Sequence, residues 1–124
     1  MGEKVIVISA SNYVSILELQ PDENGSVLRD LQVMVGGYIE IVKPADVRAP
    51  YVIVCNEDGV IDRLAINKVG TMLYGAPLVG DIVIMKDGIR NGEPDIVGMS
   101  DDEATDLANR FVSICPWLKF LVHE

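Results

Sequence analysis

The sequence contains little histidine and little cysteine, and both shortages restrict the chemistry that it can support. Its 124 residues include one histidine and two cysteines. His123 is the penultimate residue, so a catalytic triad, a Cys–His pair or a multi-histidine metal site would depend on the end of the chain. Cys55 and Cys115 are too few for a disulfide framework, and we expect them to be reduced thiols in the core. The sequence therefore predicts a protein that is not an enzyme, with no catalytic residues, no metal site and no cofactor.

Long apolar runs and an excess of basic residues are also absent. A membrane-spanning helix needs about 18 consecutive apolar residues, and no stretch approaches that length. The apolar run at residues 5–8 is much shorter than the apolar region of a signal peptide. The formal net charge is −9, whereas nucleic-acid binding depends on Lys and Arg that neutralise phosphates. We therefore expect a cytoplasmic protein that has neither a membrane nor a nucleic acid as its partner.

Residues 31–41 show how the chain is organised. Apolar residues recur with helical spacing before the glycine pair, and Ile39 and Ile41 alternate with other residues directly after it. Gly36 or Gly37 is expected to adopt the positive φ that ends many helices, because a residue without Cβ escapes the steric penalty there. This stretch therefore predicts a helix that is followed at once by a strand.

Periodicity and turn residues predict the other elements. In the first half of the chain we expect strands at 5–8 and 13–19, a helix that begins at Val27 after a Ser26 cap, and strands at 38–43 and 51–55. A turn at 56–59 is expected to fold Val60 and Ile61 back as a hairpin. In the second half we expect a strand at 82–85 that Asp87 and Gly88 end, a short strand at 96–97, and a helix at 101–115 with a capping box of Ser100 and Glu103. The strand at 51–55 is almost entirely apolar, which indicates a central strand buried on both faces. The pattern at residues 64–80 is too weak to assign an element.

This order of elements predicts the fold class. With 49% hydrophobic residues, residues 1–124 are expected to form a single domain that needs no disulfide or metal to stabilise it. We expect an α+β fold in which a single mixed β-sheet is covered on one face by two helices. The opening β-β-α-β, a hairpin followed by a crossing helix and a returning strand, resembles the β-grasp arrangement.

Residues 116–124 form an unusually apolar C-terminal tail. If the tail is a strand, apolar side chains lie on both of its faces. Burial of each such side chain is worth about 1.5–3 kcal/mol, which favours an ordered tail. We expect a homodimer through Trp117, Leu118 and Phe120, and docking of the tail on its own chain is the open alternative.

Four residues with polar side chains are candidates for ligand or partner contacts. Tyr38 and Glu40 share one face of their strand, where an aromatic ring beside a carboxylate can hold a base, an amine or an arginine. Packing at the edge of the sheet is the alternative for this pair. Asn56 and Asn67 are candidate ligand contacts, although asparagine is also a common turn residue.

An acidic segment provides the other candidates. No basic residue lies between Arg90 and Arg110. The acids of this segment are Glu93, Asp95, Asp101, Asp102, Glu103 and Asp106. A solvated helix start explains such a cluster, because acids there face the positive end of the helix dipole. Alternatively, Asp101, Asp102 and Asp106 form a docking surface for a basic partner.

Several stretches together resemble one family. They are residues 31–32 and 35–40, residues 52–59, Asn67, residues 82–84 with the glycines before them, and residues 100–103. The chain resembles an uncharacterised domain of about this length that occurs in phages, plasmids, conjugative elements and their bacterial hosts. The resemblance covers roughly residues 4–112, and the chain departs from it between Ala65 and Gly80 and in the tail after Cys115. It implies a mobile-element origin and no particular reaction.

These observations lead to two hypotheses of different classes. The first is a non-enzymatic accessory protein of a phage or mobile element, located in the host cytoplasm, that binds a host protein with a basic surface, for example in counter-defence. The alternative is a small-ligand module that holds a nucleotide-like metabolite near Tyr38, Glu40 and Asn67.

Overall fold

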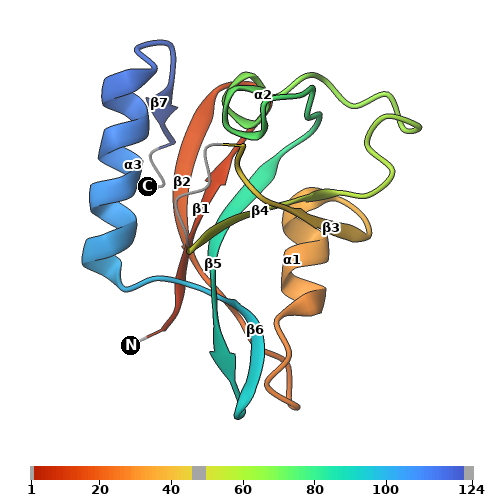
Figure 1. The fold of residues 1–124 in the computed structure, drawn as a ribbon, viewed down its shortest axis with the longest axis vertical. Helices are drawn as coiled ribbons and strands as arrows, with labels where there is room; N and C mark the ends of the chain where they lie inside the picture. The colour runs from red at the N-terminus through yellow and green to blue at the C-terminus, as the bar shows by residue number, and fades with distance from the viewer. Residues whose placement is uncertain (1, 46–49, 122–124) are drawn as a thin grey trace.

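The computed structural model of the protein describes residues 2–45 and 50–121. Its elements in chain order are β1 (Lys4–Ile8), β2 (Tyr13–Glu18), α1 (Leu28–Val35), β3 (Ile39–Val42), β4 (Tyr51–Asn56), α2 (Lys68–Tyr74), β5 (Ile82–Arg90), β6 (Glu93–Val97), α3 (Asp101–Ile114) and β7 (Lys119–Phe120). These strands form one sheet in the order β3-β4-β5-β1-β2-β7, and β6 pairs with β5 (Figure 1). The pair of β2 and β7 is parallel and the other pairs are antiparallel. The predicted α+β class with a mixed sheet is therefore confirmed.

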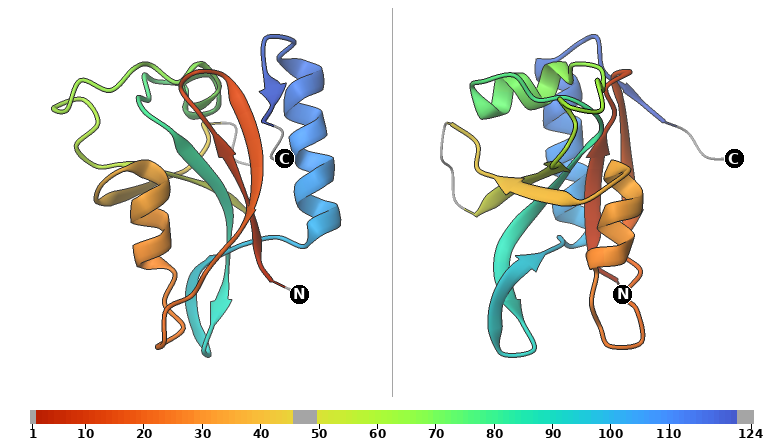
Figure 2. Two further views of the ribbon diagram at one scale, coloured as in Figure 1. Left: turned by 180° about the vertical axis from the view of Figure 1, so that it is seen from behind. Right: turned by 90° about the vertical axis from the view of Figure 1, so that its right-hand side faces the viewer.

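The sheet has a hydrophobic core on each of its two faces. In β4, Ile53 and Cys55 lie in one core cluster, whereas Val52 and Val54 lie in the other, because successive residues of a strand point to opposite faces. α1 covers the Val52 side, and α2 and α3 cover the Ile53 side (Figures 1 and 2). We call these sides the α1 face and the α3 face.

The expectation of two helices on one face is therefore wrong. The structure has three helices in its described residues, and they lie on both faces of the sheet. The physical reason is the composition of β1, β4 and β5, whose apolar side chains are buried on both sides. A strand of this kind needs cover on each face.

The β-grasp-like opening is also not found. The strand after the first helix, β3, does not return beside the first hairpin but pairs with β4 at an edge of the sheet. β1 instead lies between β2 and β5. The short connection from α1 therefore leads to the edge of the sheet that is distant from β2.

The predicted hairpin of Val60 and Ile61 is wrong as well. The turn after β4 is present, but both residues lie outside the sheet with 78% and 79% of their surface exposed. β3 and β5 already occupy the two sides of β4, so no position beside it is left. In the following segment, which the sequence pattern left unassigned, Asn67 caps the helix α2.

β5 continues through Asp87 and Gly88, where the sequence pattern had placed its end. The turn to β6 comes later, at Asn91 and Gly92, which have φ values of 53° and 81°. Positive φ at both central residues fits the twist of a two-residue hairpin turn. The β5–β6 hairpin is therefore longer than predicted, and it extends past the rest of the sheet at the lower end of Figure 1.

The helix-to-strand junction is formed as predicted, and the structure assigns the positive φ to one of the two glycines. Gly36 has a φ of 78°, and the N–H groups of Gly36 and Gly37 both donate to the carbonyl of Gln32. Gly37 is needed for a different reason, because a Cβ there would lie 2.9 Å from Nδ2 of Asn56. The helix begins at Leu28, one residue later than expected.

The predicted cap of α3 is present, but its capping box is not. The Ser100 hydroxyl accepts a hydrogen bond from the N–H of Glu103 at 3.1 Å. The Glu103 carboxylate does not return to the cap, because it accepts hydrogen bonds from the Tyr51 hydroxyl and from Nζ of Lys86, each at 2.9 Å. Glu103 therefore fastens α3 to the sheet.

The C-terminal tail docks on its own chain. Leu118 is 2% exposed within the core of the α3 face, and β7 pairs with the outer side of β2. Trp117 and Phe120 keep 39% and 41% of their surface exposed. Leu118 is therefore not free for the predicted dimer interface, and the homodimer itself stays a prediction. Residues 122–124 of the tail lie outside the described residues.

Candidate binding site at the outer edge of strand β3

β3 is an edge strand that pairs with β4 on one side only. No strand of residues 2–45 and 50–121 pairs with its other side. The N–H of Glu57 donates to the carbonyl of Tyr38 at 2.8 Å, and the register places these two residues opposite each other. Because bonded and non-bonded pairs alternate in an antiparallel ladder, the backbone groups of Ile39 and Ile41 point away from β4. The outer edge therefore presents two N–H and two carbonyl groups.

The side chains of β3 alternate between the two faces of the sheet. Ile39 packs against the core of the α1 face and Val42 against the core of the α3 face. Ile41 follows Ile39 onto the α1 face, and Glu40 follows Val42. Ile41 is 47% exposed, and Tyr38, directly before the strand, is 67% exposed. The edge thus carries two isoleucines on the α1 face, and Tyr38, Glu40 and Val42 on the α3 face.

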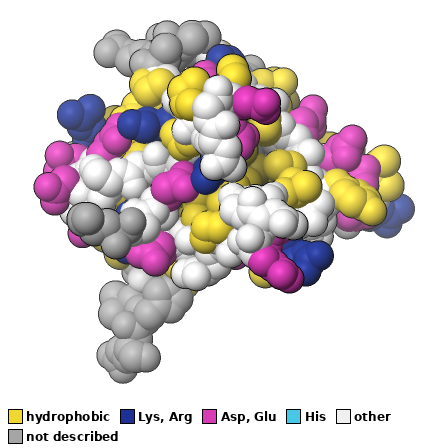
Figure 3. Space-filling view, turned by 90° about the horizontal axis from the view of Figure 1, so that it is seen from below, with side chains coloured by type: hydrophobic (Ala, Val, Ile, Leu, Met, Phe, Trp, Pro, Cys, Tyr) yellow, Lys and Arg dark blue, Asp and Glu magenta, His cyan; other side chains and the backbone are white. Residues whose placement is uncertain are grey.

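A cleft of about 430 Å³ lies on the α1 face beside this edge. It is lined by residues 24–28 and Leu31, by Ile39 and Ile41, and by residues 90, 91 and 93–96. We call it the α1 cleft. Figure 3 views the molecule from this end and shows apolar side chains in a hollow between polar loops. The cleft therefore separates the start of α1 from the β5–β6 hairpin, and β3 forms part of its wall.

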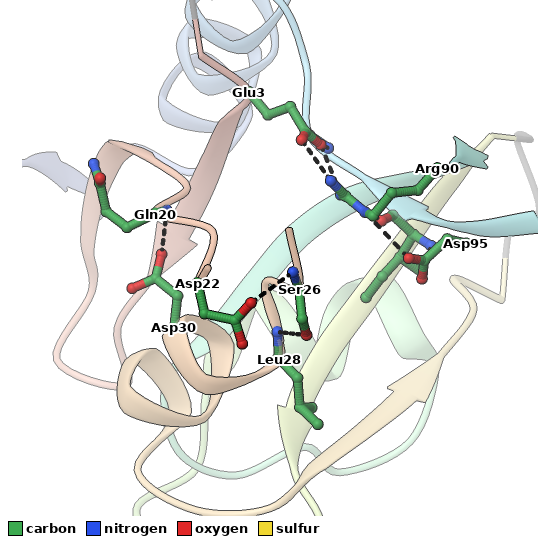
Figure 4. Close-up of polar contacts among 10 residues, drawn as sticks. Glu3, Gln20, Asp22, Ser26, Leu28, Asp30, Arg90 and Asp95 are labelled. Carbon is green, nitrogen blue, oxygen red and sulfur yellow. Dashed lines mark hydrogen bonds and ion pairs between the residues drawn. The ribbon is translucent and has the colours of Figure 1, made fainter. Parts of the chain in front are cut away.

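Side-chain hydrogen bonds fix the loop on the α1 side of the cleft (Figure 4). Oδ1 of Asp22 accepts from the N–H groups of Asn24 and Ser26, at 2.9 and 3.0 Å. The Ser26 hydroxyl accepts from the N–H of Leu28 at 3.3 Å, and the Asp30 carboxylate accepts from the N–H of Gln20 at 2.8 Å. These bonds hold the loop in place without any contribution from a ligand.

Arg90 fixes the opposite wall of the cleft (Figure 4). Its guanidinium donates to both carboxylate oxygens of Glu3, at 2.7 and 2.8 Å, to Oδ2 of Asp95 at 3.1 Å and to the carbonyl of Ile96 at 3.0 Å. The hydrogen bonds from Arg90 hold the pKa of Glu3 below its ordinary value, and those to Glu3 raise the pKa of Arg90. The network joins the segment before β1 to the β5–β6 hairpin through Arg90, and the Glu3 carboxylate also accepts from the N–H of Gly98, directly after β6, at 2.8 Å.

The α1 cleft has a net negative charge. Arg90 is the one basic residue among the lining residues that the structure describes, and its charge is met by Glu3 and Asp95. Glu93 adds a further carboxylate to the lining. An anionic group in this cleft would meet carboxylates with little positive charge left to bind it, so the cleft favours a cation or a neutral group.

A smaller pocket of about 140 Å³ lies on the other face of the same edge. Glu40, Asn56 and Cys55 contribute to its lining, but Tyr38 and Asn67 do not. Burial raises the pKa of the Cys55 thiol to about 11, so this thiol is protonated at neutral pH and is a poor nucleophile. The three residues proposed to hold a metabolite, Tyr38, Glu40 and Asn67, thus do not line this pocket together.

Both asparagines have structural hydrogen bonds. Nδ2 of Asn56 donates to the carbonyl of Val35 at 3.1 Å, and its Oδ1 accepts from the N–H of Asp58 at 2.8 Å. Asn67 is fully buried, donates to the carbonyls of Ile8 and Gly80 and caps α2 by accepting from the N–H of Gly70, each at 2.9 Å. These bonds explain both residues without a ligand, and a ligand role for them stays a prediction.

The predicted acidic residues lie elsewhere. Asp101, Asp102 and Asp106 are exposed on α3, which packs on the α3 face against β1 and β2 rather than beside β3. Among the described residues, no group of three or more His, Cys, Asp or Glu side chains is arranged to hold a metal ion. The structure therefore brings Tyr38, Glu40 and Asn56 to one edge and separates them from Asn67 and from the acids of α3.

Sequence reasoning missed the α1 cleft. Glu3 and Arg90 are 87 residues apart, so no local pattern connects them. The local signals are the turn residues Asn91 and Gly92 and the turn residues at 21–25 before α1. Neither signal shows that the two turns face each other across a cleft.

The comparison with protein families gives one match. The model of DUF3846, a domain of unknown function, matches residues 3–112. The chain belongs to this family. The match supports the resemblance proposed from the sequence, and it spans β3, the α1 cleft and α3 up to Val112. No curated protein and no solved structure matches the chain.

The DUF3846 match does not include β7, which lies beyond residue 112. The outer edge of β3 is therefore within the matched family domain, whereas the strand that covers β2 is outside the match. Within the described residues, no helix is long and apolar enough to cross a membrane.

Proposed function

We propose that this protein is a binding module that takes up an extended segment of another protein by strand addition to β3. The observation that carries the proposal is the outer edge of β3, where the backbone groups of Ile39 and Ile41 point away from β4 beside the α1 cleft. In strand addition, main-chain hydrogen bonds supply affinity, and pockets for alternate side chains supply specificity. β3 offers both.

The composition of the edge supports this role. Proteins commonly protect exposed edges with lysine, proline or a bulge, because an open edge pairs readily with other chains. Ile39 and Ile41 are apolar, and Lys43 and Pro44 come only after the strand. Four outward backbone groups are available, and each hydrogen bond that they form contributes about 0.5–1.5 kcal/mol. The edge can therefore bind a segment with moderate affinity.

A second copy of the chain is a poorer occupant than a different protein. Each copy has a net charge of −9, and Glu40 is exposed on β3 itself. Like charges on paired strands are destabilising, and two strongly acidic chains repel each other. A partner with a basic segment is favoured, because its positive charges are attracted to the acidic chain.

The proposal retains the hypothesis that the sequence suggested. The module is then a non-enzymatic accessory protein of a mobile element, its partner is a host protein with a basic surface, and counter-defence is one role that such binding serves. The metabolite hypothesis has less support, because Asn67 is fully buried with its amide bonded inside the chain.

The test compares two substitutions at one position. Ile41→Pro removes an outward N–H that has no strand partner, so it blocks strand addition while leaving the ladder to β4 intact. Ile41→Ala keeps that N–H and is the control for the loss of the side chain. Tagged parent and variants are expressed in the organism that encodes the protein, and the bound proteins are quantified by mass spectrometry.

We expect a stoichiometric partner with the parent, most of it retained with Ile41→Ala, and a loss of about tenfold with Ile41→Pro. Thermal unfolding checks that the proline variant remains folded. Equal recovery with Ile41→Pro, or no stoichiometric protein with the parent, would contradict the proposed function.

A further inference from the structure

We propose that the α1 cleft holds a lysine or arginine side chain of the bound segment and so determines which segments the module accepts. This inference rests on the proposed function, because it specifies the partner of the same β3 edge. It is carried by three features of the cleft: its position on one face of the edge, its apolar interior and its carboxylates.

The position follows from strand geometry. Ile39 and Ile41 line the cleft, so the side chains on the α1 face of β3 point toward it. A strand added beside β3 continues the same pleat, and every second side chain of that strand projects to the α1 face. Side chains at alternate positions of the segment therefore enter the cleft or lie over it.

The interior of the cleft suits the aliphatic part of a long side chain. Val27, Leu31 and Ile96 line it and are 5%, 1% and 8% exposed. Lysine and arginine bury their methylene groups on such a surface while the charged end remains near water. A volume of about 430 Å³ leaves room for one long side chain together with water.

The carboxylates of the cleft determine the sign of the charge that it accepts. Glu93 and Asp95 line the cleft, and the surface of Glu93 is exposed. Arg90 offsets only part of this negative charge, because its guanidinium pairs with both Glu3 and Asp95 and donates to the carbonyl of Ile96. A cationic side chain therefore gains mainly from Glu93, since Asp95 is paired with Arg90, whereas an acidic side chain is repelled.

The chain offers a matched pair of substitutions. Glu93→Gln removes one negative charge from the cleft and leaves the bonds between Arg90, Glu3 and Asp95 intact. Asp102→Asn removes one negative charge from the exposed surface of α3, on the other face of the sheet. Both variants have the same net charge, so a difference between them reports the position of the charge.

The first experiment selects, from a displayed library of random octapeptides, the peptides that bind the parent protein, and discards those that also bind the Ile41→Pro variant. We expect the remaining peptides to share a lysine or arginine at positions that alternate with other residues. Peptides that depend on Ile41 but show no basic preference would overturn the cleft inference and leave the proposed function in place. A library without any peptide that depends on Ile41 would overturn both.

The second experiment measures the affinity of a selected peptide and of two derivatives, with the basic residue replaced by norleucine or by glutamate. We expect the glutamate derivative to bind at least tenfold more weakly. Glu93→Gln should weaken binding of the parent peptide about two- to fivefold, the range for an exposed charge pair, and Asp102→Asn less than twofold. Equal effects of Glu93→Gln and Asp102→Asn would overturn the inference.

A third arm uses 1,5-diaminopentane, which resembles a free lysine side chain. The inference requires that this amine binds much more weakly than the peptide, because it cannot pair with the backbone of β3. An equal affinity of the amine and the peptide would show a site for free amines and would overturn the inference.

Discussion

The two edges of the sheet differ in how the chain treats them. On the β2 edge, the N–H groups of Lys119 and Leu121 donate to the carbonyls of Asn12 and Val14, at 3.1 and 2.8 Å. On the β3 edge, no described strand covers the outward groups of the two isoleucines. β7 pairs with Tyr13 and Val14 of β2 and so covers the first part of this edge, whereas no described strand covers any part of the outer side of β3. Open edges risk uncontrolled pairing with other chains, and the proposed strand addition would make use of the uncovered one.

The largest expected effect comes from uncovering the part of the β2 edge that β7 covers. Leu118 is 2% exposed and anchors β7 to the core, so Leu118→Ala should destabilise the protein by about 2–4 kcal/mol. Denaturant unfolding measures this loss. The amides of Lys119 and Leu121 should then exchange faster, which would make the two edges alike.

Phe120→Ala is the control for this substitution. Phe120 is 41% exposed in the same short strand, and its replacement should cost less than about 1 kcal/mol. If Leu118→Ala cost no more than Phe120→Ala, the tail would not depend on the core for its place on β2.

A second effect concerns the junction that positions β3. Gly37→Val should destabilise the protein by about 2 kcal/mol or more, because its Cβ would lie 2.9 Å from the Asn56 amide that bonds to Val35. Gly36→Val should cost about 1 kcal/mol or more for a different reason, the φ of 78°. Unfolding curves of both variants that superimpose on the parent curve would refute the role of this junction.

A smaller effect concerns the wall of the cleft beside β3. The pKa of Glu3 lies below its ordinary value of 4.5 because Arg90 donates hydrogen bonds to the carboxylate. The folded state therefore binds this proton less readily than the unfolded state, so the stabilisation is present above about pH 4.5 and is lost as the pH falls through the lowered pKa. Glu3→Gln should cost about 1 kcal/mol at pH 7 and less at acidic pH.

Unfolding of the parent and of Glu3→Gln across this pH range tests the sign. The difference in stability between the two proteins should shrink as the pH falls from 7 to below 4. A difference that is constant with pH would show that the charge of Glu3 is not the cause.

The local structure around β3 could be predicted from the sequence, because its signals are local. The change of period at Gly36 and the alternation of Ile39 and Ile41 are properties of neighbouring residues. Likewise, the apolar run of β4 predicts a strand buried on both faces, which the burial of residues 52–55 confirms, although β4 lies next to the edge strand β3.

The pairing of the strands could not be predicted in the same way. The position of β3 at an edge depends on β4 and β5, and the β5 partner residues are more than 40 positions away from β3. Val60 and Ile61 show the consequence, because their sequence suits a strand but both sides of β4 are already occupied. The role of Arg90 in the wall of the α1 cleft could likewise not be predicted, since its partner Glu3 is 87 residues away.

Backbone amide hydrogen exchange, followed by NMR, tests the central claim most directly. If the β3 edge is open, the amides of Ile39 and Ile41 exchange at nearly unprotected rates, whereas those of Glu40 and Val42 are slow because they bond to β4. Lys119 and Leu121 should be protected on the closed edge. Protection of Ile39 and Ile41 in the free protein at low concentration would show that the edge is already covered and would contradict the account.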